Sequence, residues 1–349
     1  MLTARENMER VVFGGGEPDR YVNQYEALKL MFSPHNFHNP MCTKGGPDVV
    51  NQWGVTNSFP ENVPGQFPVH TPEKLLVKDI EHWRDYVQIP SLKFPEEEWA
   101  MCKANMYDPI DRSKAIVATF VAPGMFEQTH HFCGIDNALM YYITNEDEMH
   151  DMIKMLTDWE LEFAEGVCSH LHPDAIFHHD DWGGEVNSFL RPSMFDDFFL
   201  DAYKQVYGYY HDHGVKMIIH HSDSYAANLV PEMIEMGINV WQGPMHTNNV
   251  PELVKKYGDK ITFMGDIDNK FVDFDGWTPE DCFKAAYASI ESVGTPKGFI
   301  PCITQGGPGS VYPGTYAELW KAIDQYNIEH FGCTQEDLDN ARLGMDVMF

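Results

Sequence analysis

The chain has 349 residues, with 53 Asp and Glu against 24 Lys and Arg, which gives a formal net charge of −29. A surface this acidic repels phosphate backbones and anionic lipids, so neither nucleic acid nor a membrane is expected as a partner. Because 43% of the residues are hydrophobic and 13% are aromatic, the acidity belongs to a folded protein with a large core and not to a disordered polyanion.

The first residues, MLTARENMERVVFGGGEPDR, contain no apolar run of the kind that a signal peptide needs. No stretch of the chain approaches the roughly 20 apolar residues of a membrane span. The seven cysteines are scattered, odd in number and without a C-x-x-C pair, which is typical of a reduced protein. We therefore expect a cytoplasmic protein.

The N-terminal third of the chain has little regular patterning. The segment YVNQYEA (21–27) favours a first strand, and residues 30–112 are rich in Pro, Gly and Asn, as in SPHNFHNP (33–40). Such a composition is typical of loops. We interpret residues 30–112 as an N-terminal extension that folds over the mouth of the main domain.

From about residue 115 onward, short apolar runs alternate with longer amphipathic segments. The expected strands are AIVATFVAPG (115–124), DAIFHHDDWGG (174–184), VKMIIHHSD (215–223), INVWQGP (238–244), KITFMGDID (260–268) and GFIPCITQGG (298–307). The expected helices cover about 145–170, 193–213, 225–236, 249–257, 279–293 and 315–331. Strands that alternate with helices pair in parallel through right-handed crossovers.

This order predicts an α/β protein with a (β/α)₈ TIM barrel, and a doubly wound open sheet is the alternative. We expect a single domain over 1–349, with the extension and first strand in 1–112 and the main barrel in 113–349. Polar residues follow the apolar part of each strand, and in a barrel those positions form the C-terminal rim, where active sites are built.

The first candidate site is HHDDWGG, where alternation sends only about half of the four ionisable side chains toward the barrel centre. His179, Asp180 and Asp181 would then serve in proton transfer or substrate hydrogen bonding. The alternative is structural: an Asp caps the following loop or helix, and a His is satisfied by the backbone.

The second candidate is IIHHSDSYA (218–226). His221 and Asp223 lie on the same side of an extended segment, at a spacing from which both could reach one metal ion. His220 and Ser222 form the alternative face, and a helix entry capped by Asp223 is the structural interpretation. Later strand ends add further polar candidates, namely Gln242, His246, Asp266, Asp268, Cys302 and Gln305.

Aromatic and Met side chains are abundant, with 22 Phe, 16 Tyr, 8 Trp and 19 Met. Most are expected in the core. Those in loop or rim segments such as FEQTHHF (126–132) would suit a pocket for a flat, largely apolar ligand.

The order of HHDDWGG, RPSMFDDFFLDAYKQVY (191–207), HGVKMIIHHSD, EMGINVWQGP and KITFMGDIDN resembles the uroporphyrinogen decarboxylase superfamily of (β/α)₈ barrels over about residues 110–331. That superfamily contains the decarboxylase and corrinoid-dependent methyltransferases, including ether-cleaving O-demethylases of anaerobic bacteria. The decarboxylase binds a polycarboxylate through arginines of an R-Q-A-G-R-type motif. This chain has seven Arg in all and reads PDRYVNQYEA at that place, so the resemblance favours the methyltransferase branch.

The resemblance also implies a ligand set. Thiol-methylating relatives hold zinc through His-x-Cys and a later Cys, and here His221 and Asp223 stand at the first two positions, with Gln305 near the third and Cys302 the nearest thiol. The resemblance therefore implies either a Zn²⁺ held by His221, Asp223 and Cys302 or Gln305, or polarisation of an ether oxygen by the same residues. The substrate-positioning and proton-supplying residues would be His179, Asp180, Asp181, His220 and His246.

The function expected from this resemblance is transfer of a methyl group from a methoxylated aromatic compound to the Co(I) of a corrinoid. The chain has no D-x-H-x-x-G corrinoid signature, so the corrinoid is expected on a separate protein. The alternatives are a decarboxylase of a small aromatic or heterocyclic acid, and a non-catalytic protein that binds a methoxylated ligand or the corrinoid protein.

Overall fold

The computed structural model describes residues 1–63, 65–305 and 311–344. At its centre a curled sheet of seven described strands, all paired in parallel, follows the order β1-β5-β6-β7-β8-β9-β10. These strands are β1 (Leu28–Met31), β5 (Ile116–Val121), β6 (Ala175–His179), β7 (Met217–His221), β8 (Val240–Gln242), β9 (Thr262–Ile267) and β10 (Phe299–Ile303). The Gln24 N–H donates to the Pro301 carbonyl at 3.3 Å, which brings the segment before β1 against β10. The sheet is therefore an α/β barrel of the TIM type.

All six strands expected after residue 115 are confirmed. The strand order never reverses, as it would in a doubly wound sheet, so that alternative is wrong. The first strand was expected at 21–27 but begins at Leu28, because the preceding residues form turns and use their side chains elsewhere. Asn23 donates to Asp324, and Glu26 pairs with Arg20 and Arg342 in a buried ionic group.

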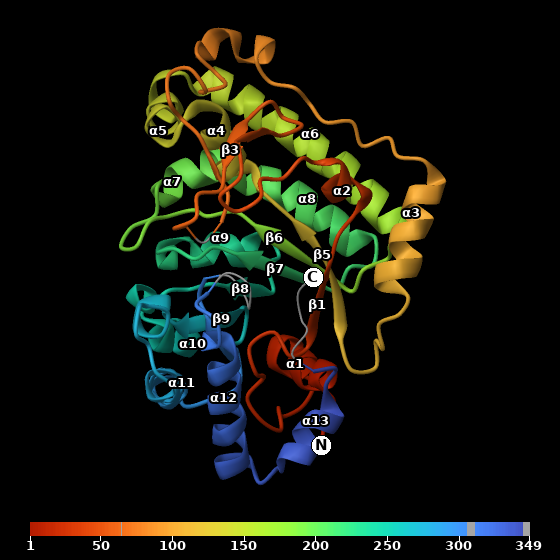
Figure 1. Cartoon of the computed structure of the whole chain (residues 1–349), viewed down its shortest axis with the longest axis vertical. Helices are drawn as coiled ribbons and strands as arrows, with labels where there is room; N and C mark the ends of the chain where they lie inside the picture. The colour runs from red at the N-terminus through yellow and green to blue at the C-terminus, as the bar shows by residue number, and fades with distance from the viewer. Residues whose placement is uncertain (64, 306–310, 345–349) are drawn as a thin grey trace.

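The six expected helices are confirmed, and they surround the sheet (Figure 1). They are α6 (Glu146–His170), α7 (Pro192–Phe195) continuing through η3 (Asp196–Leu200) into α8 (Asp201–Asp212), η4 (Ala227–Leu229) with α9 (Val230–Glu235), α10 (Val250–Tyr257), α11 (Pro279–Val293) and α12 (Thr315–Phe331). The sequence did not predict α1 (Ala4–Phe13), α4 (Met125–Cys133), α5 (Ile135–Thr144) or α13 (Gln335–Ala341). Within the described ranges, no helix has both the length and the apolar character that crossing a bilayer requires.

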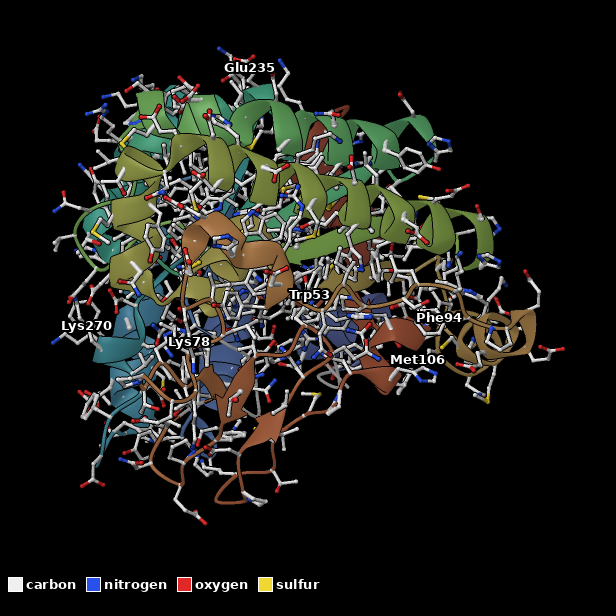
Figure 2. All side chains as sticks on the ribbon, turned by 90° about the horizontal axis from the view of Figure 1, so that it is seen from above. Trp53, Lys78, Phe94, Met106, Glu235 and Lys270 are labelled. Carbon is white, nitrogen blue, oxygen red and sulfur yellow. The ribbon has the colours of Figure 1, made fainter. Side chains whose placement is uncertain are left out.

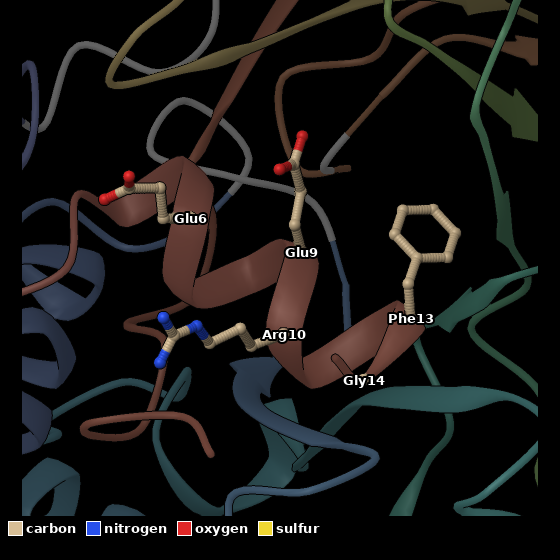
Figure 3. A pocket seen from close by; sticks show the side chains of 5 residues that line it. All are labelled: Glu6, Glu9, Arg10, Phe13 and Gly14. Carbon is tan, nitrogen blue, oxygen red and sulfur yellow. The ribbon is translucent and has the colours of Figure 1, made fainter. Parts of the chain in front are cut away.

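Helix α1 covers the N-terminal ends of the strands. The Arg5 guanidinium donates to the carbonyls of Arg112 and Ala115 and pairs with Asp174, all of which lie just before β5 or β6. Figure 1 shows α1 with α12 and α13 at one end of the molecule. A shallow hollow on α1 is lined by Glu6, Glu9, Arg10, Phe13 and Gly14 (Figure 3). It therefore lies at the end of the barrel opposite to the candidate rim residues.

Residues 32–63 and 65–115, between β1 and β5, pack in part against α4 and α6. They include α2 (Pro34–His38), the antiparallel sheet β2 (Val49–Val50), β3 (Thr56–Ser58) and β4 (Phe67–Pro68), η1 (Ile80–Asp85), α3 (Glu96–Cys102) and η2 (Lys103–Tyr107). Trp53 of this segment (Figure 2) packs against α6, where its ring centroid lies 5.1 Å from that of Trp159. The Val77 N–H donates to Phe132 of α4 at 2.9 Å, so the segment is fixed to α4 as well.

Gly124 sits where the β5–α4 connection crosses β6, and its N–H donates to the His179 carbonyl at 2.7 Å. A Cβ here would lie 2.4 Å from the Asp180 Cβ and 2.7 Å from the His178 ring. We expect Gly124→Ala to lower the free energy of unfolding by about 1–3 kcal/mol, because the crossing must open to admit the methyl group. Urea unfolding measures this, with Gly184→Ala, which meets no atom within 4 Å, as the control. Equal stability of the two variants would contradict the close approach.

Candidate functional site

Strand alternation separates the side chains of the four ionisable residues 178–181, which lie at the end of β6 and directly after it. His178 and Asp180 point toward the surrounding helices, and the His178 Nε2 lies 3.1 Å from the Glu160 carboxylate of α6. Asp180 is completely buried and accepts hydrogen bonds from four donors, which are the Phe126 N–H, the Glu127 N–H, the Trp182 indole and the Tyr203 hydroxyl. Burial raises the pKa of Asp180, and the Tyr203 hydrogen bond opposes that rise. The Asp180 side chain therefore caps α4, outside the group that meets in the barrel.

His179 and Asp181 lie on the other face, together with His221 from β7. His179 and His221 are register partners in the parallel sheet, and their rings stack at 4.4 Å. The His221 Nε2 lies 4.0 Å from an Asp181 oxygen. One ligand atom from each of these three residues, which we call the barrel group, lies within 4.8 Å of the other two. This separation is close enough for the three to converge on one metal ion.

Both imidazoles of the barrel group are oriented by a second residue. The Nδ1 of His179 bonds to Glu127 Oε2 at 2.8 Å, and the Nδ1 of His221 bonds to the Gln242 side-chain oxygen. These bonds leave each Nε2 as the available ligand atom. A ring N–H donated to a carboxylate or amide oxygen is the usual arrangement behind a metal-binding histidine.

The electrostatics of the barrel group also fit a cation. The Asp223 N–H donates to Asp181 at 3.0 Å. The carboxyl groups of Asp223, Asp181 and Glu127 all lie close enough to His179 to act on its charge. Burial opposes the charge on His179, but these neighbours outweigh it and raise its pKa to about 10. Burial, followed by repulsion from Asp181, raises the pKa of Asp223 well above its usual value. Glu127, Asp181 and Asp223 thus gather acidic oxygens around His179, and a divalent ion bound there would take the place of the proton on its imidazole.

His220, the neighbour of His221, has a structural environment. It is completely buried on the helix side of β7, where its ring nitrogens lie 3.0 Å from the Tyr207 hydroxyl and 3.2 Å from the Asp180 carbonyl. Burial lowers its pKa well below the usual value. Together with Asp180, His220 thus belongs to the packing behind the sheet, and the structure does not bring it to the barrel group.

The remaining predicted residues are spread over the rim. The Gln305 side chain lies near that of Asp223 and opposes the rise in its pKa, so Gln305 joins the edge of the barrel group. His246 is 61% exposed and lies 3.5 Å from the Asp266 carboxylate. Cys302 is fully buried, with Tyr25 and Gln242 as side-chain partners, and burial raises the pKa of its thiol. The structure therefore does not place Cys302 among the three grouped ligand atoms.

The sequence did not identify Glu127, His130 and His131 on α4 as site residues. It pointed to Gln242 as a polar rim residue but not to its role in orienting His221. The segment FEQTHHF was expected in a loop or rim, whereas the structure places it in α4. A Glu followed by His at the third and fourth positions is the signal that could have identified one helix face.

The barrel group stands above aromatic side chains. The Phe177 ring stacks near His221 with centroids 6.0 Å apart, and Phe120 and Tyr25 lie 6.0 and 6.3 Å from Phe177. Phe177 and Tyr25 are almost completely buried. These rings form an apolar layer inside the barrel, directly against the His and Asp ligands, which we call the aromatic floor.

The arginines lie away from this site. Their partners in the described ranges include Asp174 for Arg5 and Arg112, Glu17 for Arg10, Glu26 for Arg20, Asp151 for Arg84, Ser193 for Arg191 and Asp324 for Arg342. None of these partners belongs to the barrel group. A substrate with many carboxylates would thus find no guanidinium there to bind.

A solved structure shows a similar fold. The methyltransferase from Methanosarcina mazei is similar in structure, with a TM-score of 0.63 and 11% sequence identity over 93% of this chain and 99% of that chain. A D-allulose 3-epimerase from Methylomonas sp. is more distant, with a TM-score of 0.37 and 9% identity over 66% of this chain and 83% of that chain. No curated protein matches the sequence. The family model described as uroporphyrinogen decarboxylase (URO-D) matches residues 68–326. The chain therefore belongs to the uroporphyrinogen decarboxylase family.

Proposed function

We propose that this protein is a methyltransferase that takes the methyl group of an aromatic methyl ether and passes it to the Co(I) of a corrinoid on a separate protein. The observation that carries the proposal is the barrel group standing above the aromatic floor, at the C-terminal ends of the barrel strands. The similarity in fold to the methyltransferase from Methanosarcina mazei supports the reaction class.

The residues present fit a zinc ion. His179, Asp181 and His221 would hold it, because imidazole and carboxylate are established zinc ligands and three protein ligands leave a position for substrate. Bound there, zinc would act as a Lewis acid for the oxygen that departs as the methyl group leaves. Glu127 and Gln242 would keep the two imidazoles in orientation. Asp223, beside Gln305 and with its pKa raised by burial, would supply a proton to the departing oxygen.

The surroundings favour an uncharged aromatic substrate. Its ring would lie against Phe177 and its ether oxygen would face the barrel group. A substrate carboxylate would instead meet Glu127, Asp181 and Asp223, with no arginine recorded beside them. This charge argues against the alternative reaction, decarboxylation of a small aromatic acid.

The proposal is tested by incubating the protein with a panel of methoxylated phenols and a corrinoid protein reduced to Co(I). We expect the Co(I) absorption to be replaced by that of the methylated corrinoid, with one demethylated phenol released per methyl transferred. Asp181→Asn should slow this reaction at least about 100-fold, because it removes a charged ligand of the ion that would stabilise the departing oxygen, and loss of such stabilisation costs several kcal/mol of barrier.

Two results would contradict the proposal. One is the absence of methyl transfer from every donor tested, with the corrinoid protein shown to be competent with another methyltransferase. The other is release of CO₂ from an aromatic acid without any corrinoid, which would establish the lyase. A purely ligand-binding protein would keep its affinity for the phenols and give neither product.

A further inference from the structure

A second group of ligand-type side chains lies on α4, next to the barrel group. Glu127, His130 and His131 stand at positions i, i+3 and i+4, which places them on one face of the helix. One ligand atom from each lies within 4.8 Å of the other two. We call these three residues the α4 group. None of them is needed to complete the barrel group as a ligand set.

In the described part of the chain, the imidazoles of the α4 group have no hydrogen-bond partner, in contrast to those of His170 and His213. His170 and His213 each use Nδ1 to bond the carbonyl four residues earlier, both at 2.8 Å. Over the described ranges, no hydrogen bond reaches a ring nitrogen of His130 or His131, and both side chains are partly exposed. Their nitrogens are therefore accessible and unused.

Glu127 connects the two groups. Its Oε2 accepts the hydrogen bond from His179, and no partner is recorded for its Oε1 among the residues that the structure describes. A carboxylate can serve two neighbours, one with each oxygen. Glu127 is thus able to orient His179 and to offer an oxygen to the α4 group at the same time.

The α4 group is also held in place by its surroundings. Asp180 accepts the N–H groups of Phe126 and Glu127 and so fixes the start of the helix. At the other end, the His70 Nε2 lies 3.3 Å from the His131 carbonyl. Residues far apart in the sequence therefore position this face of α4, as is usual for a preformed ligand site.

We propose that Glu127, His130 and His131 bind a second divalent transition-metal ion of the zinc class, beside the ion proposed for the barrel group. Two imidazoles and a carboxylate form a common ligand set for such ions, and water would complete the coordination. Zinc–nitrogen bonds of about 2.0–2.1 Å need ligand atoms roughly 3.4 Å apart, so side-chain rotations must draw the three atoms closer. The site stands on this geometry and does not depend on methyl transfer.

The test is the metal stoichiometry of the full-length protein. Chelator-treated protein is reloaded with Co²⁺ or Zn²⁺, desalted and analysed for metal content, and the visible spectrum of the cobalt form is recorded. We expect a His130→Ala/His131→Ala variant to bind one ion fewer than the unmodified chain, with a loss of part of the cobalt absorption. A His82→Ala/His330→Ala variant, which removes two exposed histidines, should bind as many ions as the unmodified chain.

The outcomes separate this inference from the proposed function. Loss of one ion in the His130→Ala/His131→Ala variant, together with retention of that ion in His221→Ala, supports the α4 site even if no methyl transfer is found. Unchanged metal content in the His130→Ala/His131→Ala variant overturns it. Loss of the same ion in both variants also overturns it, because the two groups would then share one ion. Two controls show whether a variant loses metal ions because it misfolds. One is a His130→Asn/His131→Asn variant, and the other is the thermal unfolding of each protein.

Discussion

Replacing His221 with Ala is expected to lower the affinity of the barrel group for Zn²⁺ by at least about 100-fold. Mutation of a residue that only hydrogen-bonds to a metal ligand lowers the metal affinity by about 10–100-fold, and removal of the ligand itself lowers it further. The neighbouring His220 provides a matched control, because its side chain faces the opposite side of β7. We expect His220→Asn to bind Zn²⁺ within about threefold of the unmodified chain, whatever it does to stability.

The measurement is competition against a chromophoric chelator in a His130→Ala/His131→Ala background, so that the α4 group does not contribute. In the same background Gln242→Leu should weaken binding by about 10–100-fold, since it removes the acceptor that fixes His221. If His221→Ala and His220→Asn bind Zn²⁺ equally well, the ion is not held by the barrel group.

The arrangement of strands could be predicted because each strand after residue 115 is a short apolar run followed by polar residues. The direction in which each side chain points could not be predicted in the same way. Strands of a parallel barrel are buried on both faces, so β7 is buried at all five positions and shows no alternation of polar and apolar residues. The sequence therefore predicts that half of the His and Asp side chains face inward. It does not distinguish His221 from His220, or Asp181 from Asp180.

Helix α4 was missed for a related reason, which is that its start is stabilised from a distance. Its N-cap is Gly124, which has no side chain to accept a hydrogen bond from the first turn. That role falls to Asp180, more than fifty residues later in the chain. Local patterns cannot show such a cap, and the Glu127–His179 contact depends on it. The two ligand groups meet only because the end of β6 fixes the beginning of α4.

This arrangement predicts that Asp180→Ala lowers the free energy of unfolding by about 3–5 kcal/mol. The substitution leaves four buried or partly buried donors without their acceptor, and each such loss costs about 1–3 kcal/mol, reduced where water can enter. Tyr203→Phe, which removes one of the four donors and leaves the carboxylate in place, should cost about 1–2 kcal/mol. Urea unfolding followed by circular dichroism measures both.

The same variants separate a structural Asp180 from a catalytic one. Where folded Asp180→Ala protein is obtained at low temperature, we expect the barrel group to bind Zn²⁺ no more than about 10–100-fold more weakly, because His221 and Asp181 do not depend on the Asp180 carboxylate and only the Glu127 contact that orients His179 is loosened. The α4 group should lose its ion, because the helix that carries it is no longer capped. A protein of normal stability that has lost methyl transfer would instead assign Asp180 to the reaction, as the sequence had suggested.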